Sequence, residues 1–197
     1  MSARAKITSP AQFRESKTAH FLFADPRASV LWLVVRVWLG LQWIEAGWHK
    51  VTDPAWVGAE AGAGITGFVK GAIAKSIVSE TNPRPSVQGW YASYLETFVL
   101  PYAEIYSYVV AFGEVAVGLG LILGMLTGIA AFFGVLMNTN FLLAGTVSTN
   151  PILAIPAIFI ILAWRNAGWL GLDRFVLPLV GTPWQPGNVF DHTEAKK

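Results

Sequence analysis

The chain has 197 residues, of which 54% are hydrophobic and 13% are charged, and it contains no cysteine. Soluble domains carry roughly 25% charged residues, so this chain has more apolar surface than a soluble core could bury. The missing cysteine excludes disulfides and thiolate-ligated iron–sulfur clusters within the chain. The formal net charge is +2, without a basic stripe that could hold nucleic acid. The composition therefore indicates a membrane protein whose outer surface contacts lipid.

Four apolar stretches are long enough to cross a bilayer, because roughly 20 residues at a rise of roughly 1.5 Å span a hydrocarbon core of roughly 30 Å. Short connections make the last three of them antiparallel neighbours. We therefore predict an all-α fold, an integral membrane four-helix bundle, at residues 29–175. A polar N-terminal arm (1–28) precedes it and a tail (176–197) follows it. The spans are predicted at about residues 29–48, 103–125, 127–147 and 152–169.

The connection between the first two spans, residues 50–102, is the longest. Its 58–78 segment combines spaced apolar residues with two lysines, and its 90–100 segment is aromatic. These patterns predict amphipathic helices that lie at the membrane interface. Lysine and arginine concentrate in the N-terminal arm and in the C-terminal flank, so the positive-inside rule places both termini in the cytoplasm and the long loop outside.

Polar side chains within the predicted spans form the candidate site, because ionisable groups in lipid are costly and usually serve a function or an internal pair. Gln42, Glu45 and His49 are three and four residues apart and share one helix face. We expect a polar bundle interior, weighted to the outer half and roofed by the long loop. The catalytic candidates are Glu45, His49 and Glu114, and the cofactor-binding candidates are Arg36, Gln42, Lys50, Asn138 and Asn140.

Each candidate also has a structural interpretation. Arg36 lies at a depth within reach of Glu114, so the two could form a buried ion pair. The two asparagines could join helices by hydrogen bonds, and the residues at the outer end of the first span could be interfacial anchors. Gly113, Gly118 and Gly120 on the second span indicate close helix packing.

The cofactor that best suits these residues is a lipid-soluble quinone. Haem is disfavoured, because only His49 of the three histidines is near a span. Metal-site spacings, P-loops and dinucleotide fingerprints are also missing. A quinone takes up protons at two oxygens when it is reduced. His49 or Glu45 could donate these protons, and Lys50 could stabilise the developing negative charge.

Several segments together carry a family resemblance that covers roughly residues 28 to 184. The chain resembles the DoxX family, and within it the DoxD branch, the membrane subunit of thiosulfate:quinone oxidoreductase. The matching segments are residues 36–50 with 52–56, Gly113-Glu114 with the glycine-rich helix that follows, residues 138–140 through 148–151, and residues 167–174.

The resemblance implies a four-helix protein of the prokaryotic cytoplasmic membrane that works with a second subunit. The leading hypothesis is a quinone-binding oxidoreductase subunit, with thiosulfate as one candidate electron donor. The alternative is a non-catalytic accessory subunit of a larger respiratory or photosynthetic complex. A small-solute transporter is a third interpretation, which would require oligomerisation.

Overall fold

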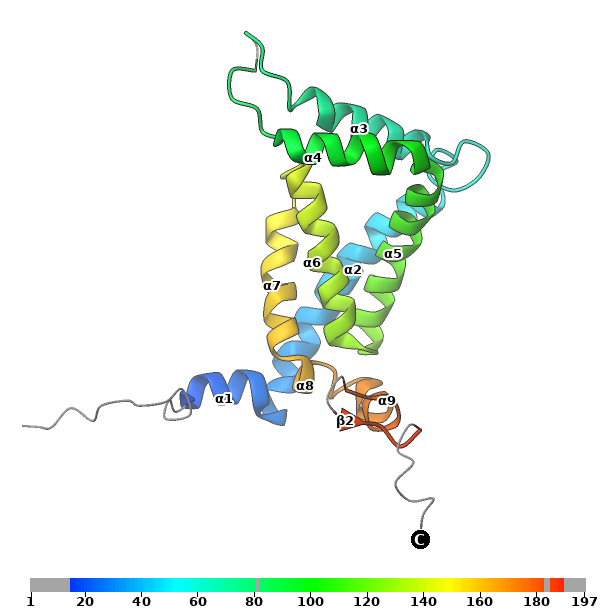
Figure 1. Ribbon diagram of the computed structural model, residues 1–197. Coiled ribbons are helices and arrows are strands. Elements are labelled where there is room, and N and C mark those ends of the chain that lie inside the picture. Colours follow the sequence, from blue (N-terminus) through cyan, green and yellow to red (C-terminus); the bar gives the residue numbers. More distant parts are fainter. Residues whose placement is uncertain (1–14, 81, 183–184, 190–197) are drawn as a thin grey trace, which may run out of the picture.

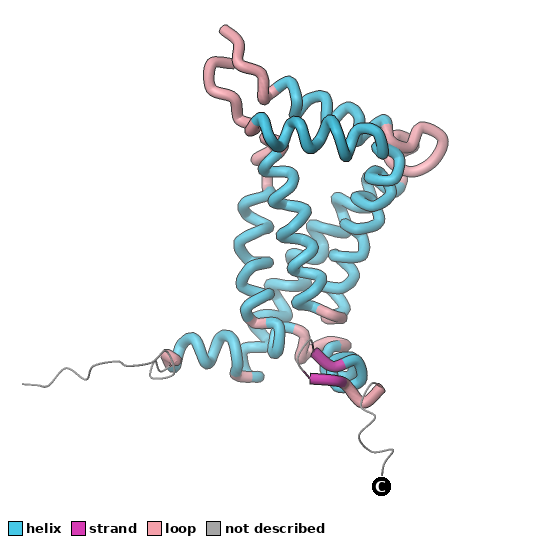
Figure 2. The backbone as a smooth tube through the Cα atoms, in the orientation of Figure 1, coloured by secondary structure: helices cyan, strands magenta, loops and turns pink. Residues whose placement is uncertain are grey.

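The computed structural model describes residues 15–80, 82–182 and 185–189, and these are mostly helical (Figure 2). The strands among them, β1 (Gly181–Thr182) and β2 (Gln185–Pro186), form one short antiparallel hairpin. Half of the predicted N-terminal arm (1–14) and the end of the predicted tail (190–197) lie outside the described residues. The helical prediction is confirmed.

Four helices run side by side through the centre of the molecule (Figure 1). In this group α2 (Ser29–Val51) packs on α5 (Ala103–Leu123), α5 on α6 (Thr127–Leu143), α6 on α7 (Asn150–Leu162), and α7 on α2. The predicted third and fourth spans differ most from the structure. The third helix ends before Gly145, which has a left-handed backbone (φ 71°), and the predicted fourth span is divided into α7 and a short α8 (Trp164–Ala167).

The outward surface of these helices is apolar. Two continuous helical stretches, Pro26–Val51 and Gly89–Leu123, are long and apolar enough to cross a membrane. Large apolar side chains that a soluble protein would bury are exposed along all four helices, which is the pattern of a lipid-facing surface. They include Val34, Leu41, Ile105, Val109, Phe112, Leu119, Phe132, Phe133, Leu136, Ile155, Phe159 and Leu162.

Glycines allow α2 and α5 to approach closely. A Cβ atom on Gly40 would lie 2.8 Å from the Gly118 carbonyl oxygen, and a Cβ on Gly118 would lie 2.8 Å from the Gly40 carbonyl oxygen. About two turns further along α2, a Cβ on Gly47 would lie 2.8 Å from the Val115 nitrogen. Small residues at such positions let membrane helices make backbone contact. This contact brings the end of α2 against the middle of α5, where Glu114 lies.

Two shorter helices lie across one end of the four-helix group (Figure 1). They are α3 (Ala63–Ala74) and α4 (Gly89–Tyr94), and we call this layer the roof. After α4 the chain continues through a π-helical turn, η3 (Leu95–Val99), and a 3-10 turn, η4 (Leu100–Tyr102), into α5. The roof has a core of its own, which includes Ile65, Val69, Val87, Tyr91 and Leu95.

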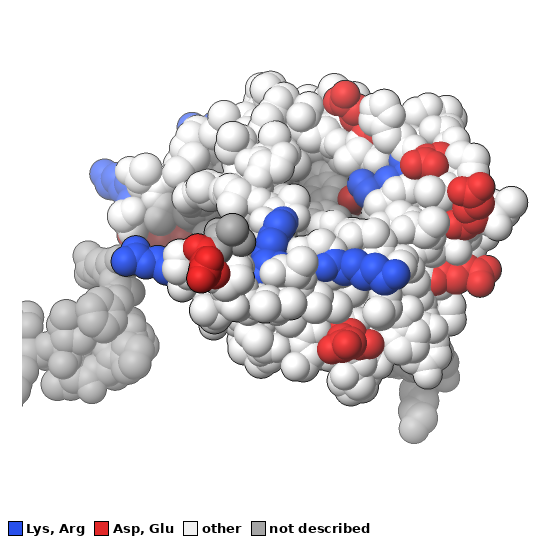
Figure 3. Space-filling model, turned by 90° about the horizontal axis from the view of Figure 1, so that it is seen from above, with Lys and Arg blue, Asp and Glu red and all other residues white. Residues whose placement is uncertain are grey.

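Charged side chains occur on the roof end of the molecule, and Figure 3 shows that face hollowed near its middle. The opposite end, which we call the base, carries α1 (Lys17–Ala24), the 3-10 turn η2 (Pro26–Ala28), α8, α9 (Asp173–Val180) and the β-hairpin (Figure 1).

Candidate functional site

Arg36 of α2 binds backbone carbonyl groups rather than a carboxylate. Its Nη1 atom donates to the carbonyl oxygens of Leu121 and Ile122, both at 2.6 Å, and Nη2 donates to that of Leu170 at 2.7 Å. The side chain is 1% exposed. The last carbonyls of a helix have no partner within the helix, so Arg36 caps the end of α5. The predicted ion pair between Arg36 and Glu114 is therefore wrong.

Asp173 performs the complementary task at the start of α6. Its carboxylate accepts hydrogen bonds from the backbone N–H groups of Leu126 (2.6 Å) and Thr127 (2.9 Å). Unpaired N–H groups at a helix start favour a negative charge. The α5–α6 turn, with Gly124 in a left-handed conformation (φ 63°), is thus held between an arginine and an aspartate. This arrangement gives Arg36 a structural role at the base.

Glu114 pairs with Lys50. The Lys50 Nζ atom donates to Glu114 Oε2 at 2.7 Å, where the glutamate side chain is 2% exposed and the lysine side chain 21% exposed. Lys50 also lies over the Trp56 ring, with its Nζ atom 5.2 Å from the ring centre. The pair joins the roof end of α2 to the middle of α5. A buried carboxylate beside a specific charged partner is a candidate functional group.

Glu45 and His49, two predicted catalytic residues, lie on the exposed side of α2, and Gln42 is only partly exposed. The shared helix face was predicted correctly, but it points away from Glu114 and not into the bundle interior. The reason is that Gly40, Gly47 and the neighbouring buried residues occupy the face of α2 that packs on α5. Glu45 and His49 are therefore placed to contact lipid or another protein.

The interior holds polar groups with unused hydrogen-bonding capacity. Asn138 of α6 is fully buried, and neither its amide nitrogen nor its oxygen has a hydrogen-bond partner among the described residues. The same holds for the Ser107 hydroxyl on α5 and the Trp43 indole nitrogen on α2. Buried polar groups are normally paired. These three groups are exceptions to that pattern in the bundle interior.

Asn140 lines a different space, a cavity between the roof and helices α5 and α6. The Tyr91 hydroxyl donates to the backbone carbonyl oxygen and to Oδ1 of Asn140, both at 3.1 Å, and Asn140 Nδ2 donates to the Leu136 carbonyl at 2.8 Å. Tyr94 and Tyr106 also line the cavity. We call this space the roof cavity; it measures about 240 Å³, and its lining includes Val69, Tyr91, Tyr94, Tyr106, Met137, Asn140 and Phe141.

An apolar groove of about 440 Å³ continues from the roof cavity along the outside of α5 and α6. The two spaces share Val109, Val110, Leu136 and Met137. Its lining includes the small residues Gly113, Ala116, Gly120 and Ala130. One end of the combined space therefore carries hydroxyl and amide groups, and the remainder is apolar.

Sequence reasoning missed two groups of functional residues. The roof tyrosines were recognised only as part of an aromatic helix, because the partner of Tyr91 is 49 positions away in the chain. Asp173 lay within a segment that was used for the family resemblance, but no local pattern identifies it as the cap of another helix. The described residues hold no group of three or more histidine, aspartate or glutamate side chains placed to bind a metal ion.

The comparisons with known proteins agree with the membrane character of the fold. The family model for DoxX, a family of membrane proteins, matches residues 31–147, which is more than half of the 197 residues and extends from α2 beyond the end of α6. No curated protein and no solved structure matches the chain. By the extent of the family match, this protein belongs to the DoxX family.

Proposed function

We propose that this protein is the quinone-binding membrane subunit of an oxidoreductase, and that the roof cavity holds the quinone headgroup. The observation that carries the proposal is the continuity of a small cavity, which holds three tyrosines and one asparagine, with an apolar groove. A membrane quinone has the same division, with a flat ring bearing two carbonyl oxygens and a long apolar tail. Tyrosine rings can pack on such a ring, and hydroxyl or amide donors can bind its oxygens.

In this proposal the protein's own groups supply donors and protons. Reduction of a quinone to its quinol requires two electrons, which a partner subunit supplies, and two protons. The second hydrogen of Asn140 Nδ2 would bind one carbonyl oxygen, and Tyr91, which donates to Asn140, would hold that amide in place. This oxygen would take up a proton as negative charge develops on it. Glu114 and Lys50 lie behind the groove, because Gly113 lines the groove and Glu114 is its neighbour on the inner face of α5. Their role would be proton exchange with the roof side.

The wider assignment rests on the family and the sequence. We propose that α2, α5, α6 and α7 all cross a prokaryotic cytoplasmic membrane, with both termini on the cytoplasmic side. The roof would then lie on the extracytoplasmic side. The short α7 can cross with the help of α8 and local thinning of the bilayer. Thiosulfate is the electron donor suggested by the resemblance to the DoxD branch.

The test is retention of quinone by the purified protein. Asn140→Leu and Tyr91→Phe should lower the amount of quinone that co-purifies in mild detergent, as measured by mass spectrometry of the extract. Thr139→Leu is the matched control, because Thr139 is exposed on the same turn of α6 and does not line the cavity. Equal quinone in the Asn140 and Thr139 variants, with both proteins folded, would disprove the site. A thiosulfate-dependent quinone reduction assay then tests the donor.

A second function, an accessory subunit of a larger membrane complex, is favoured by the outer face of α2. Glu45 and His49 are exposed there beside Trp48, whose side chain is 62% exposed. A carboxylate that faces lipid is costly, and a neighbouring protein would cover it. Stoichiometric co-purification of large subunits without bound quinone, lost on Glu45→Leu, would support this function over the first.

A further inference from the structure

The apolar groove of about 440 Å³ follows the line along which α5 and α6 meet, and we call it the seam groove. On α5 its lining extends from Val109 to Gly120, and on α6 from Leu126 to Met137, so its ends are 11 positions apart on each helix. This separation corresponds to a length of about 16 Å at a rise of about 1.5 Å per residue. The seam groove therefore leads from the roof cavity most of the way to the base.

The glycines of the seam groove differ in the room that they leave. A Cβ atom on Gly113 would meet only the end of the Met137 side chain, with its Cε atom at 3.7 Å, which is an ordinary contact. A Cβ on Gly120 would lie 2.9 Å from the Cβ of Ala130, so the two helices already touch there. Gly113 is therefore a position where the groove is open only because a side chain is missing.

The entrance from the roof cavity lies directly beside Gly113. Asn140 is one turn of α6 away from Leu136, and Gly113 is one turn of α5 away from Val109. A ligand held at Asn140 that extends past the entrance would therefore reach Gly113 first. The entrance consists of the residues that line both spaces, Val109, Val110, Leu136 and Met137.

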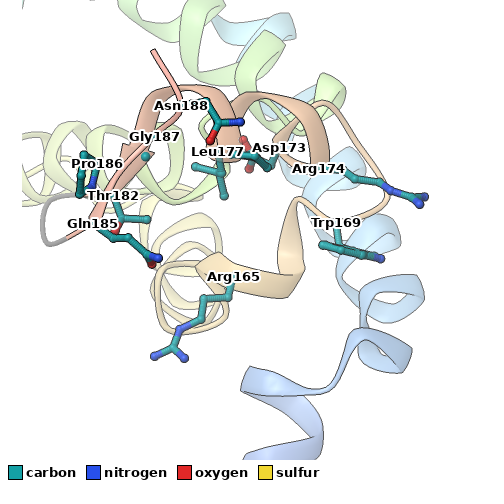
Figure 4. A pocket seen from close by; sticks show the side chains of 12 residues that line it. Arg165, Trp169, Asp173, Arg174, Leu177, Thr182, Gln185, Pro186, Gly187 and Asn188 are labelled. Carbon is teal, nitrogen blue, oxygen red and sulfur yellow. The ribbon is translucent and has the colours of Figure 1, made fainter. Parts of the chain in front are cut away.

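A pocket at the base does not belong to this path. It measures about 350 Å³, lies among α8, α9 and the β-hairpin, and shares no lining residue with the seam groove. Figure 4 shows Arg165 and Arg174 extending outward on separate sides of it. The apolar path from the roof cavity therefore reaches the α5–α6 turn, at Met125 and Leu126, without entering this pocket.

We propose that the seam groove binds the isoprenoid tail of the quinone, directed toward the base, and that Gly113 is the specificity-determining residue that admits it. This inference rests on the proposed function, because the headgroup in the roof cavity tethers the tail at the entrance. An isoprene unit has four chain bonds of about 1.5 Å and a length of roughly 5 Å. A groove of about 16 Å therefore holds about three units.

The tether is what favours the tail over an acyl chain of the surrounding lipid. Both are apolar, so the apolar lining of the groove does not by itself discriminate between them. A tail whose headgroup is already bound has a high effective concentration at the entrance, whereas a lipid chain has none of this advantage. Occupation of the groove by the tail should therefore depend on the headgroup site at Asn140.

Photolabelling of the full chain in lipid nanodiscs tests the path of the tail. The probes are benzoquinones and naphthoquinones whose isoprenoid tail carries a diazirine at its first or its third unit, and labelled residues are identified by mass spectrometry. The first-unit probe should label the entrance, and the third-unit probe should label the Gly120 and Met125 region, with both signals displaced by unlabelled quinone. Gly113→Leu should abolish the third-unit labelling there, because the added side chain fills the groove. Leu119→Phe is the control, because Leu119 is exposed on α5 but does not line the groove.

The outcomes separate the tail path from the proposed function. Displaceable third-unit labelling of α2 or α7, or undiminished labelling in Gly113→Leu, would overturn the tail path. The headgroup site would stand in that case if Asn140→Leu abolished the displaceable labelling. Labelling of the groove by a diazirine phospholipid that unlabelled quinone does not reduce would identify a lipid chain as the occupant. Absence of displaceable labelling by every probe would refute quinone binding itself. Size-exclusion chromatography of each variant checks that the protein is folded.

Discussion

Replacement of Arg36 by methionine should destabilise the fold without directly affecting quinone binding. Methionine keeps the length of the side chain but removes three hydrogen bonds to the carbonyls of Leu121, Ile122 and Leu170. Hydrogen bonds from a charged group contribute about 1.5 kcal/mol each at the low end in water-soluble proteins, and measured values inside membranes average about 0.6 kcal/mol. Loss of all three hydrogen bonds should therefore lower the free energy of unfolding by about 2 to 5 kcal/mol.

The assay is reversible unfolding in mixed micelles with increasing denaturing detergent, followed by the fluorescence of the nine tryptophans. Arg27→Met is the matched control, because the Arg27 side chain is 81% exposed and lies at the same end of the molecule. It should unfold close to the wild-type midpoint. If Arg36→Met unfolded together with Arg27→Met and had lost its quinone, Arg36 would be a binding residue, and the capping role derived from its geometry would be refuted.

Three other predictions concern helix packing, the buried ion pair and acidity. Gly118→Leu should disrupt the α2–α5 contact and lower the unfolding midpoint strongly, whereas Gly71→Leu should not, because a Cβ on Gly71 meets no atom within 4 Å; equal midpoints would contradict the packing argument. Lys50→Met should lower the free energy of unfolding by about 3 kcal/mol, because it leaves Glu114 unpaired. Addition of Glu114→Leu should restore most of this free energy. A double variant as unstable as Lys50→Met would argue against the pairing. The hydrogen bonds from the Arg27 side chain and backbone lower the pKa of Asp25 to about 2. The stabilisation of the α1–α2 connection is therefore present above the unfolded pKa of about 3.9 and is lost as the pH falls toward 2. Hydrogen exchange of this connection should increase over that range, and no increase should be seen with Asp25→Asn.

The sequence alone determined the class of the protein. Few charges, four long apolar stretches and one long amphipathic connection indicate a helical membrane protein, because the period and length of apolar segments are local properties that the bilayer selects directly. The resemblance to the DoxX family was also confirmed, because the family model matches residues 31–147. The helix face shared by Gln42, Glu45 and His49 was also predictable from the 3.6-residue period.

Only the tertiary structure decided what each polar residue contacts. The period of a helix shows which residues share a face, but not the direction in which that face points. The glycine contact of α2 with α5 turns Glu45 outward and brings Lys50 to Glu114. Arg36 finds its partners in carbonyls 85 to 134 positions away. Such partners are set by the rotation and depth of packed helices, which depend on small differences in packing among many side chains rather than on any local pattern.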